Sequence, residues 1–187
     1  MFVLVLGALL VLIVLGAIFA IGVYNTLVTY RNRVENAWSQ IDVQLKRRYD
    51  LIPNLVQTVK GYMKHEKTTL ENVTKYRAQL VTGSVADKAK ADGMLTQALK
   101  SLFAVSENYP KLVANESFKA LQEELAGTEN KIAYARQAYN DSVLQYDTYK
   151  ETIPGSLLVG FGKFPEIEYF KAPQDEKIKK APKVEFD

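Results

Sequence analysis

Residues 2–23 of the chain read FVLVLGALLVLIVLGAIFAIGV and include no charged or hydrogen-bonding side chain. Sixteen of these 22 residues are Leu, Ile, Val or Phe. A helix of this length spans about 33 Å at ~1.5 Å per residue, and the hydrocarbon core of a bilayer is about 30 Å thick. The stretch therefore predicts one transmembrane helix within residues 1–24, and the lipid bilayer is the first expected partner.

A cleaved secretory signal is the alternative for this stretch. Such a signal has basic residues before a shorter apolar core and small residues at its cleavage site. No Lys or Arg precedes the stretch, which favours the anchor, although Ala17 and Ala20 resemble a cleavage site. Gly16, Ala17 and Ala20 also form a small-residue face on which a second transmembrane helix is expected to pack.

The charges that flank the stretch predict its orientation. Arg31 and Arg33 follow it closely, and Lys46, Arg47 and Arg48 come later, whereas no basic residue precedes it. Lys and Arg are enriched on the cytoplasmic side of membrane spans. The N-terminus is therefore expected outside, with the rest of the chain in the cytoplasm.

The composition of the chain of 187 residues gives no sign of reactive chemistry. It carries no Cys, one His and a net charge of +3 from 24 basic and 21 acidic residues, so no nucleic-acid partner is expected. His65-Glu66 begins like the zinc motif HExxH, but Thr69 replaces the second His. Glycine-rich phosphate loops and the GxSxG nucleophile motif are also missing. No enzyme activity, catalytic residue, cofactor or metal is predicted.

Apolar residues recur at spacings of three and four from residue 25 to residue 150, which is typical of helices. The first helix is expected to continue from the membrane to about Arg48, and Asp50 and Pro53 predict a turn and a new helix to about residue 82. Further helices are expected over 86–112 and 115–150. The predicted fold is all-α, with the single-pass transmembrane helix continuing into an antiparallel up-down-up-down four-helix bundle over residues 25–152.

Residues 153–187 are expected to form an apolar segment near the membrane followed by a disordered tail from Ala172. The end of the fourth helix returns toward the bilayer in this topology, and SLLVGFGKF follows it at residues 156–164. Capping of the open end of the bundle is one interpretation of that segment. The other is membrane-surface contact, with the candidate residues Leu157, Leu158, Phe161 and Phe164.

Two long stretches of the chain closely resemble the LemA family. They are AWSQIDVQLKRRYDLIPNLVQTVKGYMKHE at 37–66 and NESFKALQEELAGTENKIAYARQAYNDSV at 115–143. The resemblance implies a bacterial inner-membrane protein with a single span, a helical bundle in the cytoplasm and no enzymatic activity. Because genes of this family often neighbour those of membrane metalloproteases, it also implies a scaffold or adaptor.

The most distinctive part of this resemblance is expected to be an interaction surface. Its candidate residues are Trp38, Asp42, Lys46, Arg47, Arg48, Asp50 and Asn54. For the three basic residues, the alternative is that they complement the dipole at the end of the first helix.

Three functions remain open from the sequence. The first is a self-associating scaffold, a homo-oligomer that presents partners to a membrane metalloprotease. The second is an oligomer that shapes the membrane or organises the cell envelope. An unrecognised hydrolase is the third.

Overall fold

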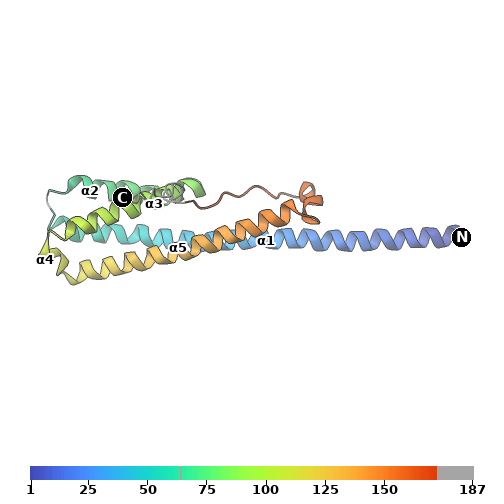
Figure 1. Cartoon of the computed structure of the whole chain (residues 1–187), viewed down its shortest axis with the longest axis horizontal. Coiled ribbons are helices and arrows are strands. Elements are labelled where there is room, and N and C mark those ends of the chain that lie inside the picture. Colours follow the sequence, from blue (N-terminus) through green and yellow to red (C-terminus); the bar gives the residue numbers. More distant parts are fainter. Residues whose placement is uncertain (64, 172–187) are drawn as a thin grey trace, which may run out of the picture. The chain divides into compact units, whose positions relative to one another are not determined.

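The computed structural model describes residues 1–63 and 65–171, and this part of the chain is helical without any strand. Its elements are α1 (Phe2–Lys60), α2 (Lys67–Gln79), α3 (Val85–Ser106), α4 (Pro110–Val113), α5 (Glu116–Glu151) and the short 3-10 helices η1 (Gly155–Leu157) and η2 (Val159–Phe161) (Figure 1). The prediction of an all-α fold is confirmed. The tail predicted to be disordered lies outside the described residues.

The chain forms two compact units. Unit 1 consists of Met1–Trp38 and Ala138–Ile167, and unit 2 consists of Ser39–Gln137 and the chain from Glu168. The helices α1 and α5 each contribute one part to unit 1 and another part to unit 2. The domain boundaries predicted after residues 24 and 152 stay a prediction.

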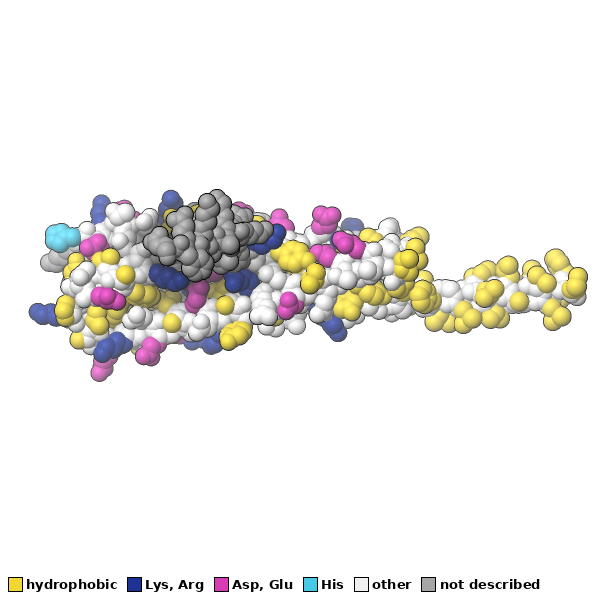
Figure 2. All heavy atoms as spheres, in the orientation of Figure 1, with side chains coloured by type: hydrophobic (Ala, Val, Ile, Leu, Met, Phe, Trp, Pro, Cys, Tyr) yellow, Lys and Arg dark blue, Asp and Glu magenta, His cyan; other side chains and the backbone are white. Residues whose placement is uncertain are grey.

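Unit 1 contains the apolar N-terminal part of α1. This part is long and apolar enough to cross a membrane, and none of the most apolar 18-residue window is buried. Figure 2 shows hydrophobic side chains distributed along it. Beyond it, α1 and α5 join through aromatic contacts: Tyr30 lies tilted against Tyr149 at 5.3 Å between ring centres, and Trp38 meets Tyr139 edge to face at 5.6 Å. The start of α1 is therefore a candidate membrane span, and its continuation is a packed helix.

Unit 2 is a bundle built from parts of α1 and α5 together with α2 and α3. Its core is a stripe of buried aliphatic and aromatic residues that includes Ile41, Leu55, Leu99 and Phe118. Within the unit, successive helices of the set α1, α2, α3 and α5 run in opposite directions (Figure 1). This is the order expected for the predicted up-down-up-down topology.

The turn between α2 and α3 is specified locally. Gly83 has a φ of 89°, a left-handed conformation that glycine adopts without strain. Ser84 then caps α3: its hydroxyl accepts from the Asp87 N–H, and the Asp87 carboxylate accepts from the Ser84 N–H. This reciprocal pair satisfies two backbone donors at the start of α3.

The predicted turn at Asp50 and Pro53 is wrong, because α1 continues through both residues to Lys60. Proline has no N–H, so Pro53 cannot donate to the carbonyl of Tyr49 four residues earlier. Arg77 of α2 replaces this donor: its Nε–H donates to the Tyr49 carbonyl at 2.9 Å. Its guanidinium also lies 3.7 Å from the centre of the Tyr49 ring. A contact from another helix thus makes the proline compatible with the interior of α1.

The later boundaries shift as a consequence. The predicted second helix, which was to reach residue 82, is replaced by the end of α1, a connection at 61–66 and the shorter α2. The predicted third helix is divided into α3 and the single turn α4. The fourth helix matches α5 to within about a residue, which is the usual uncertainty of helix ends.

We predict that Pro53 and Arg77 are energetically coupled. Arg77→Met should lower the free energy of unfolding by about 1–3 kcal/mol, because the Tyr49 carbonyl loses its donor. In a Pro53→Ala background, the new backbone N–H should satisfy that carbonyl and reduce the loss by about 1 kcal/mol. Urea unfolding of the full chain in mild detergent, followed by circular dichroism, measures this cycle. An equal loss in both backgrounds would show that Arg77 acts only through its stacking on Tyr49.

Candidate functional site

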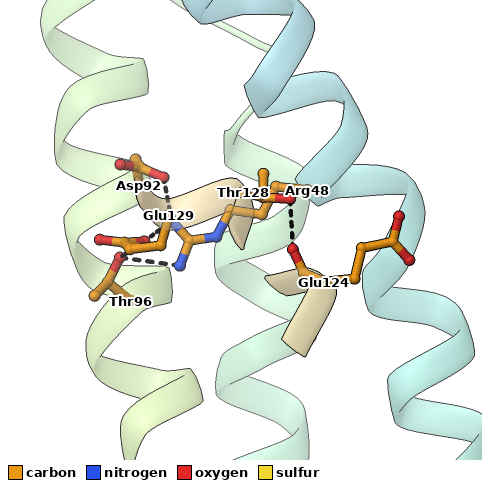
Figure 3. Close-up of polar contacts among 6 residues, drawn as sticks. All are labelled: Arg48, Asp92, Thr96, Glu124, Thr128 and Glu129. Carbon is orange, nitrogen blue, oxygen red and sulfur yellow. Dashed lines mark hydrogen bonds and ion pairs between the residues drawn. The ribbon is translucent and has the colours of Figure 1, made fainter. Parts of the chain in front are cut away.

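The most concentrated polar site lies inside unit 2, where Arg48 of α1 meets side chains of α3 and α5 (Figure 3). The Arg48 side chain is only 2% exposed. Its Nη1 lies 2.5 Å from an oxygen of Asp92 and 2.7 Å from an oxygen of Glu129. Its Nη2 donates to the Thr96 hydroxyl at 3.0 Å, and that hydroxyl donates to Glu129 at 2.9 Å. We call these four residues the Arg48 cluster.

The electrostatics of the Arg48 cluster are set by its burial. Burial raises the pKa of Asp92 above its ordinary value of 3.8, and the nearby charge of Glu129 acts in the same direction. Arg48 and the more distant Arg136 oppose this rise by favouring the carboxylate. Two carboxylates thus share one buried guanidinium, and the side of the cluster at Glu129 remains open, since that side chain is 40% exposed.

The chemistry of the Arg48 cluster is that of a clamp. A guanidinium is a planar cation whose N–H donors point in fixed directions. The donors of Arg48 therefore require acceptors at defined positions, which α3 and α5 supply. Removing one partner of a buried ion pair is far more costly than removing an exposed pair. The cluster therefore joins α1, α3 and α5 through one buried side chain within unit 2.

The other residues of the predicted interaction surface make simpler contacts. Asp42 accepts from Lys88 of α3 at 2.6 Å, and Arg47 donates to Glu124 of α5 at 2.5 Å. Lys46 and Asp50 pair with each other along α1 at 2.7 Å. Arg48 is interior rather than part of a surface, whereas Asn54 is exposed.

Trp38, the remaining residue of this set, belongs to unit 1, where it packs on Tyr139. Several members of the predicted surface thus hold helices together. Lys46, Asp50 and Asn54 are exposed to solvent, and Lys46 and Asp50 pair with each other along α1.

The membrane end of unit 1 contains the second set of predicted residues. Gly16 and Ala17 are exposed on the apolar part of α1, and nothing lies within 4 Å of a methyl group placed on Gly16. Ala20 is partly covered and lines an apolar hollow, together with Leu158 and Phe161. The expected packing of a second transmembrane helix on this face stays a prediction.

The residues proposed to touch the membrane surface divide into two kinds. Leu157 and Phe161 are exposed, and Leu158 is half-buried. Phe164 differs, because it is buried against Tyr24 with 5.6 Å between ring centres. It therefore packs within unit 1 and does not face outward like Leu157 and Phe161.

The sequence analysis missed the partners of Arg48 and the exposed Ile153. Asp92 and Arg48 each continue an apolar stripe, Asp92 three residues before Leu95 and Arg48 three residues after Leu45. The signal available in the sequence was one charged residue on the apolar stripe of each of two helices. Arg48 and Asp92 have opposite charges, which indicates a buried ion pair. In the described ranges 1–63 and 65–171, no three His, Asp or Glu side chains gather as a metal site would require.

The fold and these sites define a class of protein: an all-helical chain whose first helix begins with a candidate membrane anchor and ends in the core of a bundle. A family model described as the LemA family matches residues 37–186. The chain belongs to the LemA family.

Known relatives are distant in sequence. Protein LemA of Metamycoplasma hominis is 28% identical, over 84% of this chain and 73% of the relative. Magnetosome protein MamQ 2 of Paramagnetospirillum magneticum is 26% identical, over 79% of this chain and 64% of the relative. Magnetosome protein MamQ of Magnetospirillum gryphiswaldense is 24% identical with the same coverage. The chain thus spans somewhat less than two thirds of the length of the MamQ proteins.

We predict that two adjacent arginines differ sharply in their contribution to stability. Arg48→Ala should lower the free energy of unfolding by about 3–5 kcal/mol, because it leaves Asp92 buried without its cation. Arg47→Ala, the matched control, should cost at most about 1 kcal/mol, because its pair with Glu124 is close to half-exposed. Urea unfolding of both full-length variants in the same detergent makes the comparison. Similar losses would contradict the assignment of the Arg48 cluster as the clamp.

We predict a pH dependence that belongs to Asp92. Because its pKa is raised in the folded state, the folded chain retains this proton after the unfolded chain has lost it. Stability from this group is fully present below the unfolded pKa of about 3.9 and declines as the pH rises through the folded pKa. The stability of the natural chain relative to Asp92→Asn should therefore fall as the pH rises above about 4. Unfolding curves across this pH range test the sign, and a relative rise would contradict it.

Proposed function

We propose that this LemA-family chain is a membrane-anchored scaffold without catalytic activity of its own, which presents its helical bundle to other proteins at a bacterial inner membrane. One observation supports this proposal above the others. The helix α1 carries both the exposed apolar stretch and core residues of unit 2, such as Ile41 and Leu55, without a break. A single element thus links the candidate anchor to the bundle.

The charged side chains of unit 2 support a binding role over a catalytic role. The carboxylates of Asp92 and Glu129 are held by Arg48, and Asp42 is held by Lys88. These contacts stabilise the arrangement of the helices. They suit a body whose surface, rather than a reactive group, performs the function.

We propose that the exposed part of α1 around Lys46, Asp50 and Asn54 is the contact surface. Val43 is 63% exposed on the same helix and adds apolar area to it. Aromatic and apolar residues with a charged surround are typical of protein interfaces. A second copy of the chain and a membrane metalloprotease are the partners that we propose to test first.

A membrane-shaping oligomer is the second candidate function. It is supported by the exposed apolar residues Leu157 and Phe161, which belong to the same unit as the candidate span. The similarity to proteins named for magnetosomes is compatible with it. Deformation of liposomes by the purified full-length chain would favour this function over a pure adaptor.

We propose an orientation with the N-terminus outside and the bundle in the cytoplasm. Arg31 and Arg33 follow the apolar stretch within about 15 Å of its end, at ~1.5 Å per residue. Lys and Arg are enriched on the cytoplasmic side of membrane spans, and these two residues carry the proposal.

The absence of cysteine from the sequence allows a direct test with single introduced cysteines. We predict that Lys46→Cys and Asn54→Cys form adducts with a second copy or another protein when bacterial membranes are treated with a bifunctional maleimide. Mass spectrometry identifies the attached protein. An impermeant maleimide should label the same variants only after the cells are opened, if the bundle is cytoplasmic.

The matched control is Tyr134→Cys, since Tyr134 is 76% exposed on α5 and lies outside the proposed surface. It should label as well as the other variants after opening but yield fewer adducts. A full-length chain that is a single monomeric species in detergent and gives no adduct from either test position would contradict the scaffold proposal.

A further inference from the structure

We propose that the chain touches the membrane a second time, through an apolar collar formed by residues 153–161 beside Ala20 and Tyr24 of α1. The collar inserts into the boundary between lipid headgroups and acyl chains. This inference rests on the proposed membrane anchorage by α1. All the residues that carry it belong to unit 1. The partner is a lipid surface.

The height of the collar along α1 is the first argument. Leu158 and Phe161 line an apolar hollow with Ala20, Ile21 and Tyr24 of α1. Ala20 and Ile21 belong to the apolar stretch and lie about 27–29 Å from Phe2 along the helix axis, at ~1.5 Å per residue. This distance is close to the thickness of the hydrocarbon core, which is roughly 30 Å. The collar therefore stands where α1 leaves the hydrocarbon.

The exposure of the collar is the second argument. Ile153, Leu157 and Phe161 are 79%, 64% and 82% exposed, respectively. Three large apolar side chains exposed within nine residues of the chain indicate an interaction site. Here the neighbouring exposed surface is the candidate span itself, whose most apolar window is entirely unburied. A membrane that covers the span therefore also covers the collar side chains that lie beside the end of the span.

Part of the collar backbone is hydrogen-bonded within the chain. The Leu158 N–H donates to the Gly155 carbonyl at 2.9 Å, and the Phe161 N–H donates to the Leu158 carbonyl at 3.0 Å. The Ser156 N–H likewise donates to the Thr152 carbonyl, one residue after the end of α5. These hydrogen bonds lower the cost of placing an irregular segment where little water remains.

Packing holds the collar in position on both sides. Gly155 is buried, and a side chain placed there would overlap the backbone carbonyl of Tyr149 in α5. After the collar, Phe164 packs on Tyr24, and the carbonyl of Lys163 accepts from Arg31 at 3.3 Å. These contacts fix the position of the exposed apolar side chains. The basic residues Arg31 and Lys163 lie at the level expected for lipid headgroups.

Tryptophan fluorescence of the full chain can test this inference. The chain has one tryptophan, so Trp38→Phe provides a background in which Phe161→Trp is the only reporter. The protein is reconstituted in phosphatidylcholine and phosphatidylglycerol vesicles with or without brominated acyl chains. We expect several-fold stronger quenching by brominated lipid than in the control described below, together with an emission maximum at shorter wavelength. Leu157→Trp provides a second reporter in case the first disturbs the fold.

The matched control is Leu144→Trp in the same background. Leu144 is 56% exposed on α5 in unit 1, between Tyr139, which packs on Trp38, and Tyr149, which packs on Tyr30. Those partners lie about 10–22 Å beyond Val23 along α1, at ~1.5 Å per residue. Its tryptophan should therefore remain in water and escape quenching by lipid.

The outcomes separate this inference from the proposed anchorage. Vesicle flotation of the same samples reports the anchorage, and a chain that does not float with the vesicles overturns both ideas. A chain that floats while its reporters at 157 and 161 behave like the reporter at 144 overturns the collar alone. Emission at shorter wavelength without quenching by brominated lipid would show that a second copy of the chain covers the collar, and it also overturns lipid contact.

Discussion

The buried charge of Arg48 is the constraint on which the arrangement of unit 2 depends. A buried guanidinium remains a cation, so its burial requires hydrogen-bond acceptors from the helices that enclose it. Asp92 and Thr96 supply them from α3, and Glu129 supplies one from α5. Apolar packing alone would tolerate small shifts between these helices. The hydrogen bonds of a planar side chain tolerate them far less, which gives the bundle one register.

A second contact between residues far apart in the sequence, Arg77 and Tyr49, explains the length of α1. Pro53 lies inside the helix, where it removes a hydrogen bond and normally ends or bends the element. Arg77 restores the missing donor to Tyr49 and stacks on its ring. This contact allows α1 to continue past Pro53 to Lys60, so that Leu55 and Val59 join the core of unit 2 on the same helix as Ile41. The proposed scaffold depends on one helix that carries both the candidate span and core residues of the bundle.

Unit 1 combines two apolar surfaces of different origin. The first is the candidate span, whose most apolar 18-residue window is unburied. The second is the collar, which Gly155 places close to Tyr149 and which is followed by Phe164, packed on Tyr24. Phe164 belongs to the protein interior, and Ile153, Leu157 and Phe161 face outward. One short segment thus contains both a buried ring and outward-facing apolar side chains.

Periodicity and length were sufficient to predict the helical class, the N-terminal candidate span, the extent of α5 and the alternating directions in unit 2. These features follow from the spacing of apolar side chains, which acts within a few turns of the chain. The same local information led to a false turn at Pro53, because the compensating donor comes from Arg77, which is 28 residues away.

The sequence by itself therefore determined the helical class of the chain, the segment that can enter a membrane and the faces that are apolar. Only the tertiary structure decided that Arg48 is interior rather than part of a surface, and that Phe164 is covered while Phe161 is not. The physical reason is the range of the interactions. Helix formation and hydrophobic periodicity are properties of neighbouring residues, whereas the burial of a charge or a ring depends on partners that folding brings from elsewhere in the chain.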